Sequence, residues 1–468
     1  MKEEIKVYTN SDGEIQRVHV VRFDDWSKLA FLSDLSKESA VSKQARLECF
    51  RDIYQNYLVP ACPYIFSQMV MFHLPDNLEV DFPLQTKEYG AVADPLLAAS
   101  IALKKGVKIK GERIVFSDKK IEAFWHELEK KDAVRIIRGK LPFTQIIPVS
   151  DHTGYLSKVY TDAKMKVNAN FFIMDPIDCA TIYDQLGVPF GLCVKNGVVE
   201  NPPLFGREAL LVNRNQEVCV KALETSDLEI EIGGTRFKHG KNATIYSRPN
   251  RTKTPKQKGL DLVIVGRSVV AVQRGGRVSI PASGFVLHID LDEKIDAKID
   301  AEVNAKMESI SPGTEVIYHG LEDIVFGIQV GNSIIRDGIK TEQFLSRFYN
   351  IYHLERNAFP PSLYPMDFQK ARAARIALGA DKAGKPMLFW AEGAGKLGYK
   401  KGVDSCGASL SEMAEIAEDL GMHNGVNLDG GGSAQILVGN ERRLLISDRN
   451  KEDNSEAERL VPLGLMIK

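Results

Sequence analysis

The sequence predicts an α+β fold in which a helix-rich N-terminal region precedes a β-rich domain. Two segments early in the chain, residues 36–59 and 119–139, place apolar side chains at helical spacing. After about residue 140 the pattern changes to short β-branched runs separated by glycine or asparagine turns. We therefore expect two parts, residues 1–135, of unknown role, and residues 136–468.

Helical periodicity supports the assignment of the N-terminal region. Its spaced apolar residues are Ala45, Cys49, Ile53 and Leu58 in the first segment, and Ile121, Phe124, Trp125 and Leu128 in the second. Residues three or four positions apart share one face of a helix, so each segment could bury an apolar stripe.

Alternating or continuous apolar runs predict the strands of the second part. They occupy residues 143–151, 164–172, 190–200, 209–213, 228–237, 260–281 and 284–292. Glycine pairs within two of these runs, at Gly233–Gly234 and Gly275–Gly276, suit tight hairpin turns. The domain is expected to be dominated by β-hairpins.

One helix is predicted inside this β-rich part, over residues 410–420. Ser409 and Glu412 have the spacing of a capping box, and Gly421 stands where a helix-ending glycine belongs. Apolar runs at residues 386–392 and 426–428 flank the helix. This order predicts a β-α-β unit.

Composition excludes several functional classes. The 468 residues are 44% hydrophobic and 26% charged, with a formal net charge of −1, which disfavours a nucleic-acid-binding surface. No run approaches the roughly 20 apolar residues of a membrane span. The charged start and the six scattered cysteines, none in a CxxC pair, predict a cytoplasmic protein with neither a zinc site nor a disulfide framework. We expect no cofactor and no metal.

The segment GVNLDGGGSAQILVGN, residues 425–440, places three glycines directly after Asp429 at a strand end. Glycine weakens a strand by roughly 0.5–1 kcal/mol relative to alanine, so the bare backbone must have a use. One use is an anion-binding concavity of N–H groups beside a carboxylate. The other is a tight hairpin with a bulge, which spacing alone leaves equally open.

Ordered blocks across residues 140–468 resemble the phosphodiester glycosidase family. The blocks are VNANFF (167–172), GVPFGLCVKNGVV (187–199), VVAVQRGGRVSIPASGFVLHI (269–289), RIALGADKAGKPMLFWAEG (375–393), SCGASLSEMAEIAEDLG (405–421), NLDGGGSAQILVGN (427–440) and ERLVPLGLMI (458–467). The chain departs from the family pattern at Ala169, at Ala373–Ala374, at Glu392 and at Ala434.

The resemblance implies an enzyme that cleaves the C1–O bond of a sugar 1-phosphodiester, releasing free sugar and a phosphomonoester. Its expected substrate is a sugar phosphodiester or a phosphorylated glycan. The implied catalytic residues are Asp429, Glu392 and Arg375, and the implied substrate-binding residues are Asn168, Asn170, Gly430, Gly431, Gly432, Ser433 and Arg459. Arginine suits the phosphate because its planar fork binds two oxygens at once, and a carboxylate suits an oxocarbenium-like sugar.

Each candidate also has a structural reading. Arg375 could pair with Asp381, Glu392 could be an exposed strand end, and the two asparagines could cap a turn or bond a neighbouring strand. For the whole chain, the alternative is a non-catalytic carbohydrate- or phosphate-binding protein that retains the fold. A third hypothesis makes residues 1–135 a docking module for a larger partner.

Overall fold

A computed structural model describes most of the β-rich part and the first 33 residues. The described residues are 2–33, 156–173, 187–290, 310–341, 372–393, 399–444 and 458–468, apart from residues 160, 249, 250, 440 and 460, together with residues 181, 183 and 184, short strands between residues 69 and 148, and residues 119, 122, 123 and 126.

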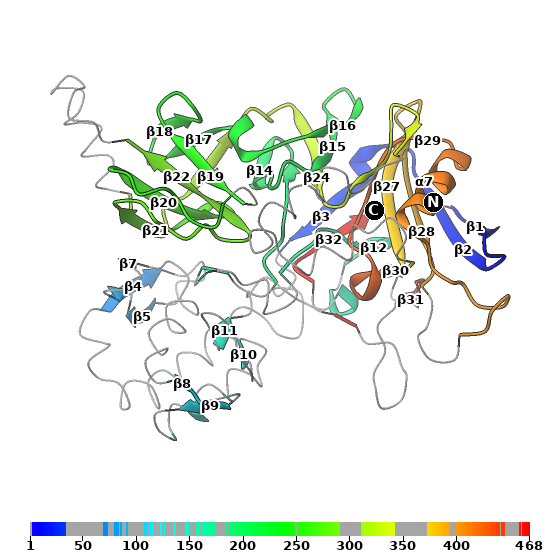
Figure 1. The fold of residues 1–468 in the computed structure, drawn as a ribbon. Helices are drawn as coiled ribbons and strands as arrows, with labels where there is room; N and C mark the ends of the chain where they lie inside the picture. The colour runs from blue at the N-terminus through cyan, green and yellow to red at the C-terminus, as the bar shows by residue number, and fades with distance from the viewer. Residues whose placement is uncertain are drawn as a thin grey trace.

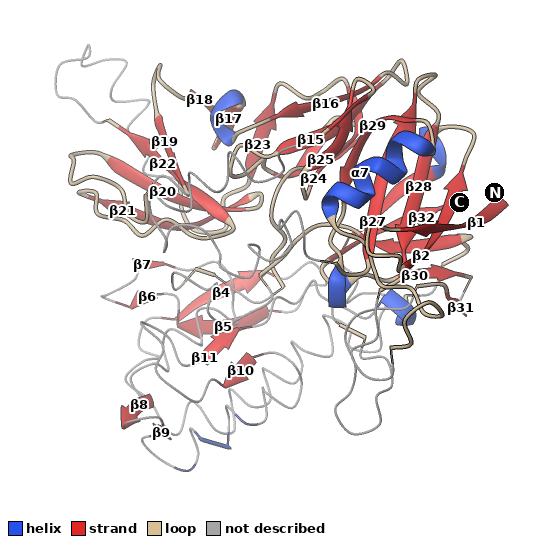
Figure 2. Cartoon of the chain, turned by 45° about the vertical axis from the view of Figure 1, so that its right-hand side comes forward, coloured by secondary structure: helices blue, strands red, loops and turns tan. Residues whose placement is uncertain are grey.

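A seven-stranded sheet forms one end of the described structure (Figure 1). Its strands, in spatial order, are β1 (Lys2–Thr9), β2 (Ile15–Arg22), β28 (Pro386–Ala391), β27 (Arg375–Asp381), β29 (Met422–Asn427), β25 (Ser333–Arg336) and β26 (Ile339–Lys340). Helix α7 (Leu410–Asp419) lies against one face of this sheet (Figure 2). The β1–β2 hairpin therefore extends a sheet whose other strands come from the second half of the chain.

Alternation along the strands separates the two faces of this sheet. Val18 and Val20 of β2 and Phe389 of β28 pack with the apolar face of α7. Leu388 and Trp390, the intervening residues of β28, face a second core on the opposite side. Successive strand residues point to opposite faces, so both faces of β28 are covered.

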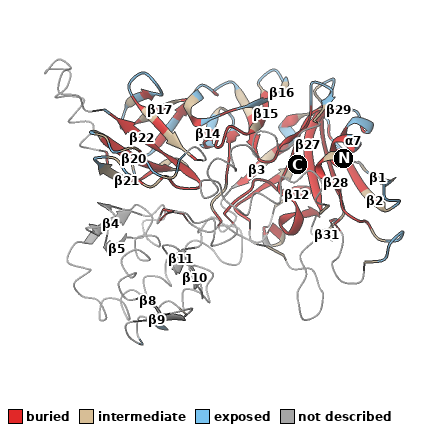
Figure 3. Cartoon of the chain, viewed as in Figure 1, coloured by how far each residue is buried: buried red, intermediate tan, exposed pale blue. Residues whose placement is uncertain are grey.

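A five-stranded sheet contributes to this second core. Its order is β3 (Leu29–Ser33), β32 (Leu463–Ile467), β12 (Met165–Asn168), β30 (Ile436–Val438) and β31 (Glu441–Arg442). Phe31, Met165 and Leu465 join Ile376 and Trp390 in one buried cluster. Figure 3 shows the central strands of both sheets coloured as buried, whereas edge strand β1 is intermediate or exposed.

Three further sheets lie beside this assembly. They are β14 (Val198–Asn201), β13 (Cys193–Lys195), β24 (Ile324–Gln329), β15 (Glu208–Asn213) and β16 (Val218–Ala222); β18 (Thr235–Lys238), β17 (Glu229–Ile232) and β23 (Val316–His319); and β19 (Thr244–Ser247), β22 (Gly284–Ile289), β20 (Leu260–Val265) and β21 (Ser268–Arg274). Apolar residues of all three sheets form a further core that includes Ile230, Leu262 and Phe285. Other residues of the first of these sheets, such as Leu210 and Ile328, join the core that contains Trp390.

The β-rich fold predicted for residues 136–468 and its single helix are confirmed for the described residues. The capping box between Ser409 and Glu412 is formed, and Gly421 adopts a φ of 76° after the helix. Strands β28 and β29 run parallel on either side of β27, because each is antiparallel to it. The predicted β-α-β unit is therefore present, with one strand inserted between its two strands.

The helix-rich N-terminal region is not supported. Residues 2–33 form β1, β2 and β3, and the described segments that follow pair as β4 (Met69–His73) with β5 (Glu79–Pro83), β6 (Gln85–Thr86) with β7 (Gly90–Ala91), β8 (Val107–Lys110) with β9 (Arg113–Phe116), and β10 (Val134–Ile136) with β11 (Ile146–Pro148). Residues 119, 122, 123 and 126 are helical, but the end of the second predicted helix is strand β10. The first predicted helix, residues 36–59, lies outside the described residues. Apolar spacing alone did not distinguish these outcomes.

Residues 2–33 share two sheets with strands of the region predicted to begin at residue 136. Val20 lies opposite Phe389 in one sheet, and Phe31 lies opposite Leu465 in the other. The boundary near residue 135 stays a prediction for the remainder of the N-terminal part. None of the described helices is long and apolar enough to cross a membrane.

A variant lacking residues 2–33 should lose its cooperative thermal transition. The deletion removes the buried side chains of Trp26 and Phe31 and uncovers β28 and β32. Losing one large aromatic side chain from a core costs about 3–5 kcal/mol, against total stabilities of about 5–15 kcal/mol. Calorimetry would check this, and a transition within a few degrees of that of the full chain would contradict it.

Candidate active site

The candidate site lies where β29 ends, β27 begins and α7 begins. The Leu428 N–H donates to the carbonyl of Ile376 at 2.8 Å, and the Gly431 N–H donates to that of Ala374 at 2.7 Å. Ala373 and Ala408 exchange backbone hydrogen bonds of 3.2 and 2.9 Å just before the helix. Three elements distant in sequence therefore hold the loop that carries Asp429.

Close packing explains the glycines of this loop. A Cβ atom at Gly430 would stand 2.7 Å from the Ala374 carbonyl oxygen and 3.5 Å from Cδ of Arg375. Gly431 has a φ of 63°, a left-handed conformation that favours glycine, and it opens a 3₁₀ turn, Gly431–Ser433. The bare backbone lets the loop sit directly on the first residues of β27.

The predicted row of anion-binding amides is not formed at two of its positions. The Gly431 N–H is used by Ala374, and the Ser433 N–H donates to the carbonyl of Gly430 at 3.2 Å. The 3₁₀ turn satisfies its own backbone, which a sequence pattern of glycines cannot reveal. These two amides are therefore committed to backbone carbonyls.

Asp429 is a buried carboxyl group, with only 1% of its surface exposed. Burial raises the pKa of Asp429 to about 7, while Arg459, Ser433, the Gly430 N–H and Arg375 act to lower it. Among the described residues, neither carboxylate oxygen has a hydrogen bond of good geometry, so Ser433 and Gly430 act as nearby dipoles. A carboxyl group that changes charge near neutral pH is suited to acid-base or nucleophilic chemistry.

The structure brings both predicted arginines to this carboxyl group. Arg459 donates from Nη1 to the Ser433 hydroxyl at 3.1 Å and is half-buried. Arg375 is 1% exposed, and its Nε donates to the Ala408 carbonyl at 3.3 Å. The positive charge of Arg459 lowers the pKa of Asp429 more than any other group does, and Arg375 lowers it further. The more exposed Arg459 is better placed to contact a ligand.

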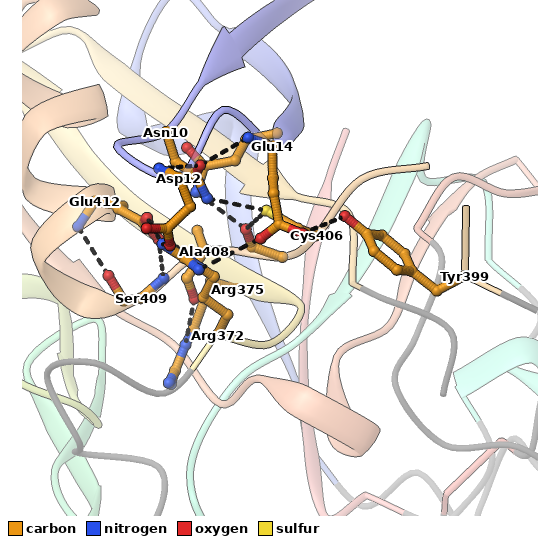
Figure 4. Close-up of polar contacts among 12 residues, drawn as sticks. Asn10, Asp12, Glu14, Arg372, Arg375, Tyr399, Cys406, Ala408, Ser409 and Glu412 are labelled. Carbon is orange, nitrogen blue, oxygen red and sulfur yellow. Dashed lines mark hydrogen bonds and ion pairs between the residues drawn. The ribbon is translucent and has the colours of Figure 1, made fainter. Parts of the chain in front are cut away.

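An ionic cluster fixes the segment that carries Arg375 (Figure 4). Arg372 pairs with Glu412 of α7 at 2.9 Å, with Asp12 at 2.8 Å and with Glu14 at 3.5 Å. Asp12 and Glu14 belong to the turn between β1 and β2. The cluster therefore ties the N-terminal hairpin, the start of α7 and the approach to β27 together, and sequence reasoning did not identify Arg372.

Asn168 and Gln435 clamp the two ends of the glycine loop. The Asn168 side chain donates to the Asp429 carbonyl and accepts from the Gln435 N–H, both at 2.8 Å. Gln435 in turn donates from Nε2 to the carbonyl of Arg459 at 2.8 Å. Asn168 thus holds the backbone of Asp429. This is a structural role, like the alternative to sugar binding that the sequence left open. Gln435 was not predicted; its only sequence signal is its position six residues after Asp429.

Asn170 is also buried and bonded to the backbone. Its Nδ2 donates to the carbonyls of Phe190 and Gln329, at 3.1 and 3.2 Å. Its 2% exposure leaves the predicted contact with a sugar hydroxyl as a prediction that the described structure does not favour. The side chains of Asn168 and Asn170 thus both bond the protein backbone, so their predicted contacts with sugar hydroxyls stay predictions.

Glu392 is held apart from Asp429. Its carboxylate accepts from Arg17 and contacts Nε2 of His19, both at 2.8 Å, so it faces β2 and is not an exposed strand end. Burial acts to raise the pKa of Glu392, but these two partners outweigh it and hold the pKa below its ordinary value. Strand β28 is two strands from β29, about 10 Å at ordinary strand spacing. Strand β27 therefore lies between the strand that ends before Glu392 and the strand that leads to Asp429.

Within the described residues, no group of three or more histidine, cysteine, aspartate or glutamate side chains is arranged to hold a metal ion. The polar groups at the site are a carboxyl, a hydroxyl, two guanidinium groups and two amides. This set matches a ligand that combines negative charge with hydroxyl groups.

Residues 258–468 match the sequence model of the phosphodiester glycosidase family. The resemblance drawn from the sequence is confirmed for this part of the chain, which contains Asp429, Arg375, Arg459 and Glu392. A search of curated proteins found no match.

Three of the solved structures that match this chain are the following. A hypothetical protein from Synechocystis is 20% identical, with a TM-score of 0.37 over 70% of this chain and 55% of that one. A putative exported protein from Burkholderia pseudomallei is 17% identical, with a TM-score of 0.37 over 67% and 68%. The catalytic domain of zebrafish N-acetylglucosamine-1-phosphodiester alpha-N-acetylglucosaminidase, auto-inhibited by its pro-peptide, is 11% identical, with a TM-score of 0.38 over 100% and 82%. The chain thus spans about half of the Synechocystis protein.

Replacing Asp429 with asparagine should change how stability depends on pH. The pKa of Asp429 rises from 3.8 to about 7 on folding, so between these values the folded chain keeps a proton that the unfolded chain releases. Stability from this group therefore falls as pH rises through that window, by up to roughly 4 kcal/mol at 1.36 kcal/mol for each pH unit.

Denaturant titrations of both proteins across this pH range would measure the effect. The free energy of unfolding of Asp429→Asn minus that of the wild type should increase as pH rises, because asparagine does not titrate. A difference that stays constant across the range would contradict the burial-driven shift.

Proposed function

We propose that this protein is a glycoside hydrolase that cleaves the C1–O bond of a sugar 1-phosphodiester, releasing free sugar and a phosphomonoester. The observation that carries the proposal is a buried carboxyl group, Asp429, with a pKa of about 7, beside Arg459 and Arg375. The match of residues 258–468 to the phosphodiester glycosidase family supports the same reaction class.

The arginines account for the phosphate half of the reaction. Departure of a phosphate monoester requires stabilisation of negative charge more than a proton, because the leaving group is weakly basic. Arg459 carries a fork of donors that can bind two phosphate oxygens, and Ser433 orients it from one side. Arg375, more deeply buried, adds fixed positive charge from beneath the loop.

Asp429 accounts for the sugar half. As phosphate leaves, the anomeric carbon gains positive charge, which an ionised carboxylate can stabilise, attack, or support by activating water. Because the leaving group needs no proton, the ionised form of Asp429 is the active one. Burial keeps this carboxylate poorly solvated and therefore reactive, while the two arginines keep ionisation accessible near neutral pH.

The raised pKa also favours an enzyme over the non-catalytic binding protein. A carboxyl group buried without good hydrogen bonds costs folding free energy, and such costs are characteristic of groups retained for chemistry. A protein that only bound a phosphorylated sugar would be served by the arginines alone.

Asp429→Asn should lower kcat for a sugar 1-phosphodiester by at least about 100-fold, a typical loss when a group acts in the transition state. Glu392→Gln is the matched control, because it also removes one carboxylate near this sheet. The partners of Glu392 are Arg17 and His19, so its replacement should lower kcat less. In the wild type, the rate should rise with pH through an apparent pKa near 7.

The measurement is release of sugar and phosphomonoester by mass detection across a panel of sugar 1-phosphodiesters and UDP-sugars. Near-normal turnover in Asp429→Asn, or an equal loss in Glu392→Gln, would remove Asp429 from its chemical role.

Arg459→Lys should separate the phosphate from the sugar. Lysine keeps the positive charge but loses the planar fork, so hydrolysis of phosphodiesters should fall by roughly 10-fold or more. Hydrolysis of an aryl glycoside of the same sugar, which lacks a phosphate, should change much less. A comparable loss on both substrates would show that Arg459 acts on something other than the phosphate.

A further inference from the structure

Strand β1 forms an edge of the seven-stranded sheet. Among the described strands it pairs only with β2, in an antiparallel register that joins Lys2 to Arg22 and Thr9 to Ile15. Figure 1 draws the β1–β2 hairpin at the right-hand margin of the described structure. Ile5 and Val7 of this edge strand are 56% and 62% exposed, so the edge carries apolar surface as well as backbone groups. Long apolar edges are sites where another strand can add.

The register of the hairpin identifies the backbone groups that face outward. The Asn10 N–H donates to the Glu14 carbonyl, so even-numbered residues of β1 bond inward to β2. Antiparallel pairing alternates these directions along a strand. The N–H and carbonyl groups of Glu3, Ile5 and Val7 therefore point away from β2.

The sequence of β1 is complementary to itself about Ile5. If a second copy adds antiparallel with Ile5 opposite Ile5, then Glu4 of each copy lies opposite Lys6 of the other, and Glu3 lies opposite Val7. Opposite charges on directly facing residues stabilise a strand pair, and Ile5 and Val7 of both copies gather on one face. Centring the pair on Lys6 instead would place two lysines face to face.

The outward backbone groups are compatible with this register. In the Ile5-centred pair, the facing residues are Glu3 with Val7 and Ile5 with Ile5, which are the residues whose N–H and carbonyl groups point outward. Hydrogen-bonding direction thus permits this arrangement, and charge favours it over the Lys6-centred one. Its two-fold symmetry closes the interface.

We propose that β1 is a homodimer interface, in which two copies of this chain join their seven-stranded sheets through antiparallel β1–β1 pairing centred on Ile5. In the seven-stranded sheet, β2, β28 and β27 lie between the proposed interface at β1 and β29, which leads into the glycine loop. The proposal does not depend on the reaction that the site catalyses.

Charge reversal tests this register directly. The wild type should have twice the 52.1 kDa mass of one chain in light scattering after size-exclusion chromatography. Glu4→Lys places positive charges at both facing positions, Lys6→Glu places negative charges there, and each variant alone should have the mass of one chain. An equimolar mixture of the two should recover the doubled mass, because each variant then faces its opposite charge.

Two further variants complete the test. The double variant Glu4→Lys with Lys6→Glu should again be dimeric, and Ile5→Pro should not, because it removes only an outward N–H. The current ion pairs of Glu4 with Arg22 and Lys6 with Asp419 are exposed, so the reversals should leave the fold intact. A wild-type mass of one chain, dimeric single variants, or a mixture that stays monomeric would each overturn the proposal.

Discussion

Burial of the Asp429 carboxyl group is the constraint on which the rest of the candidate site depends. Desolvation makes its negative charge costly, and two nearby arginines and the dipoles of Ser433 and Gly430 partly offset that cost. The glycines permit this burial, because Gly430 has no side chain to hold the loop away from Ala374 and Arg375. Asn168, at the end of β12, then fixes the loop by bonding the backbone of Asp429 and Gln435. The loop is therefore shaped more by the need to place one carboxyl group than by any direct use of its backbone amides.

Support for this arrangement extends to the first residues of the chain. The β1–β2 hairpin covers β28, and its turn reaches Arg372, which also binds the first turn of α7. Arg372 precedes Arg375 by three residues, so the ionic cluster and the candidate site are joined by a short, fixed segment. Changes far from Asp429 in sequence, in the hairpin turn or at the helix start, can thus alter the position of an arginine beside the reacting carboxyl group.

Local signals were predictable from the sequence, and long-range pairings were not. The capping box at Ser409, the hairpins and the grouping of Asp429 with both arginines followed from residue types and spacing or from the family resemblance. The pairing of β2 with β28 joins residues more than 360 positions apart, and no periodicity encodes it. For the same reason the contacts of Glu392 and Asn168 were not predicted. The partners of Glu392, Arg17 and His19, come from that hairpin, and the Asn168 amide bonds the loop backbone. Helical spacing in residues 119–139 was misleading where tertiary pairing produced strand β10.

Infrared difference spectroscopy of the Asp429 carboxyl group tests the central claim most directly. A protonated carboxyl group absorbs at a frequency well separated from that of the ionised form, and subtracting the spectrum of Asp429→Asn isolates the contribution of this residue. The account predicts a protonated band that persists at mildly acidic pH and disappears with a midpoint near 7. A band lost at the pH typical of an exposed aspartate, near 4, would contradict it.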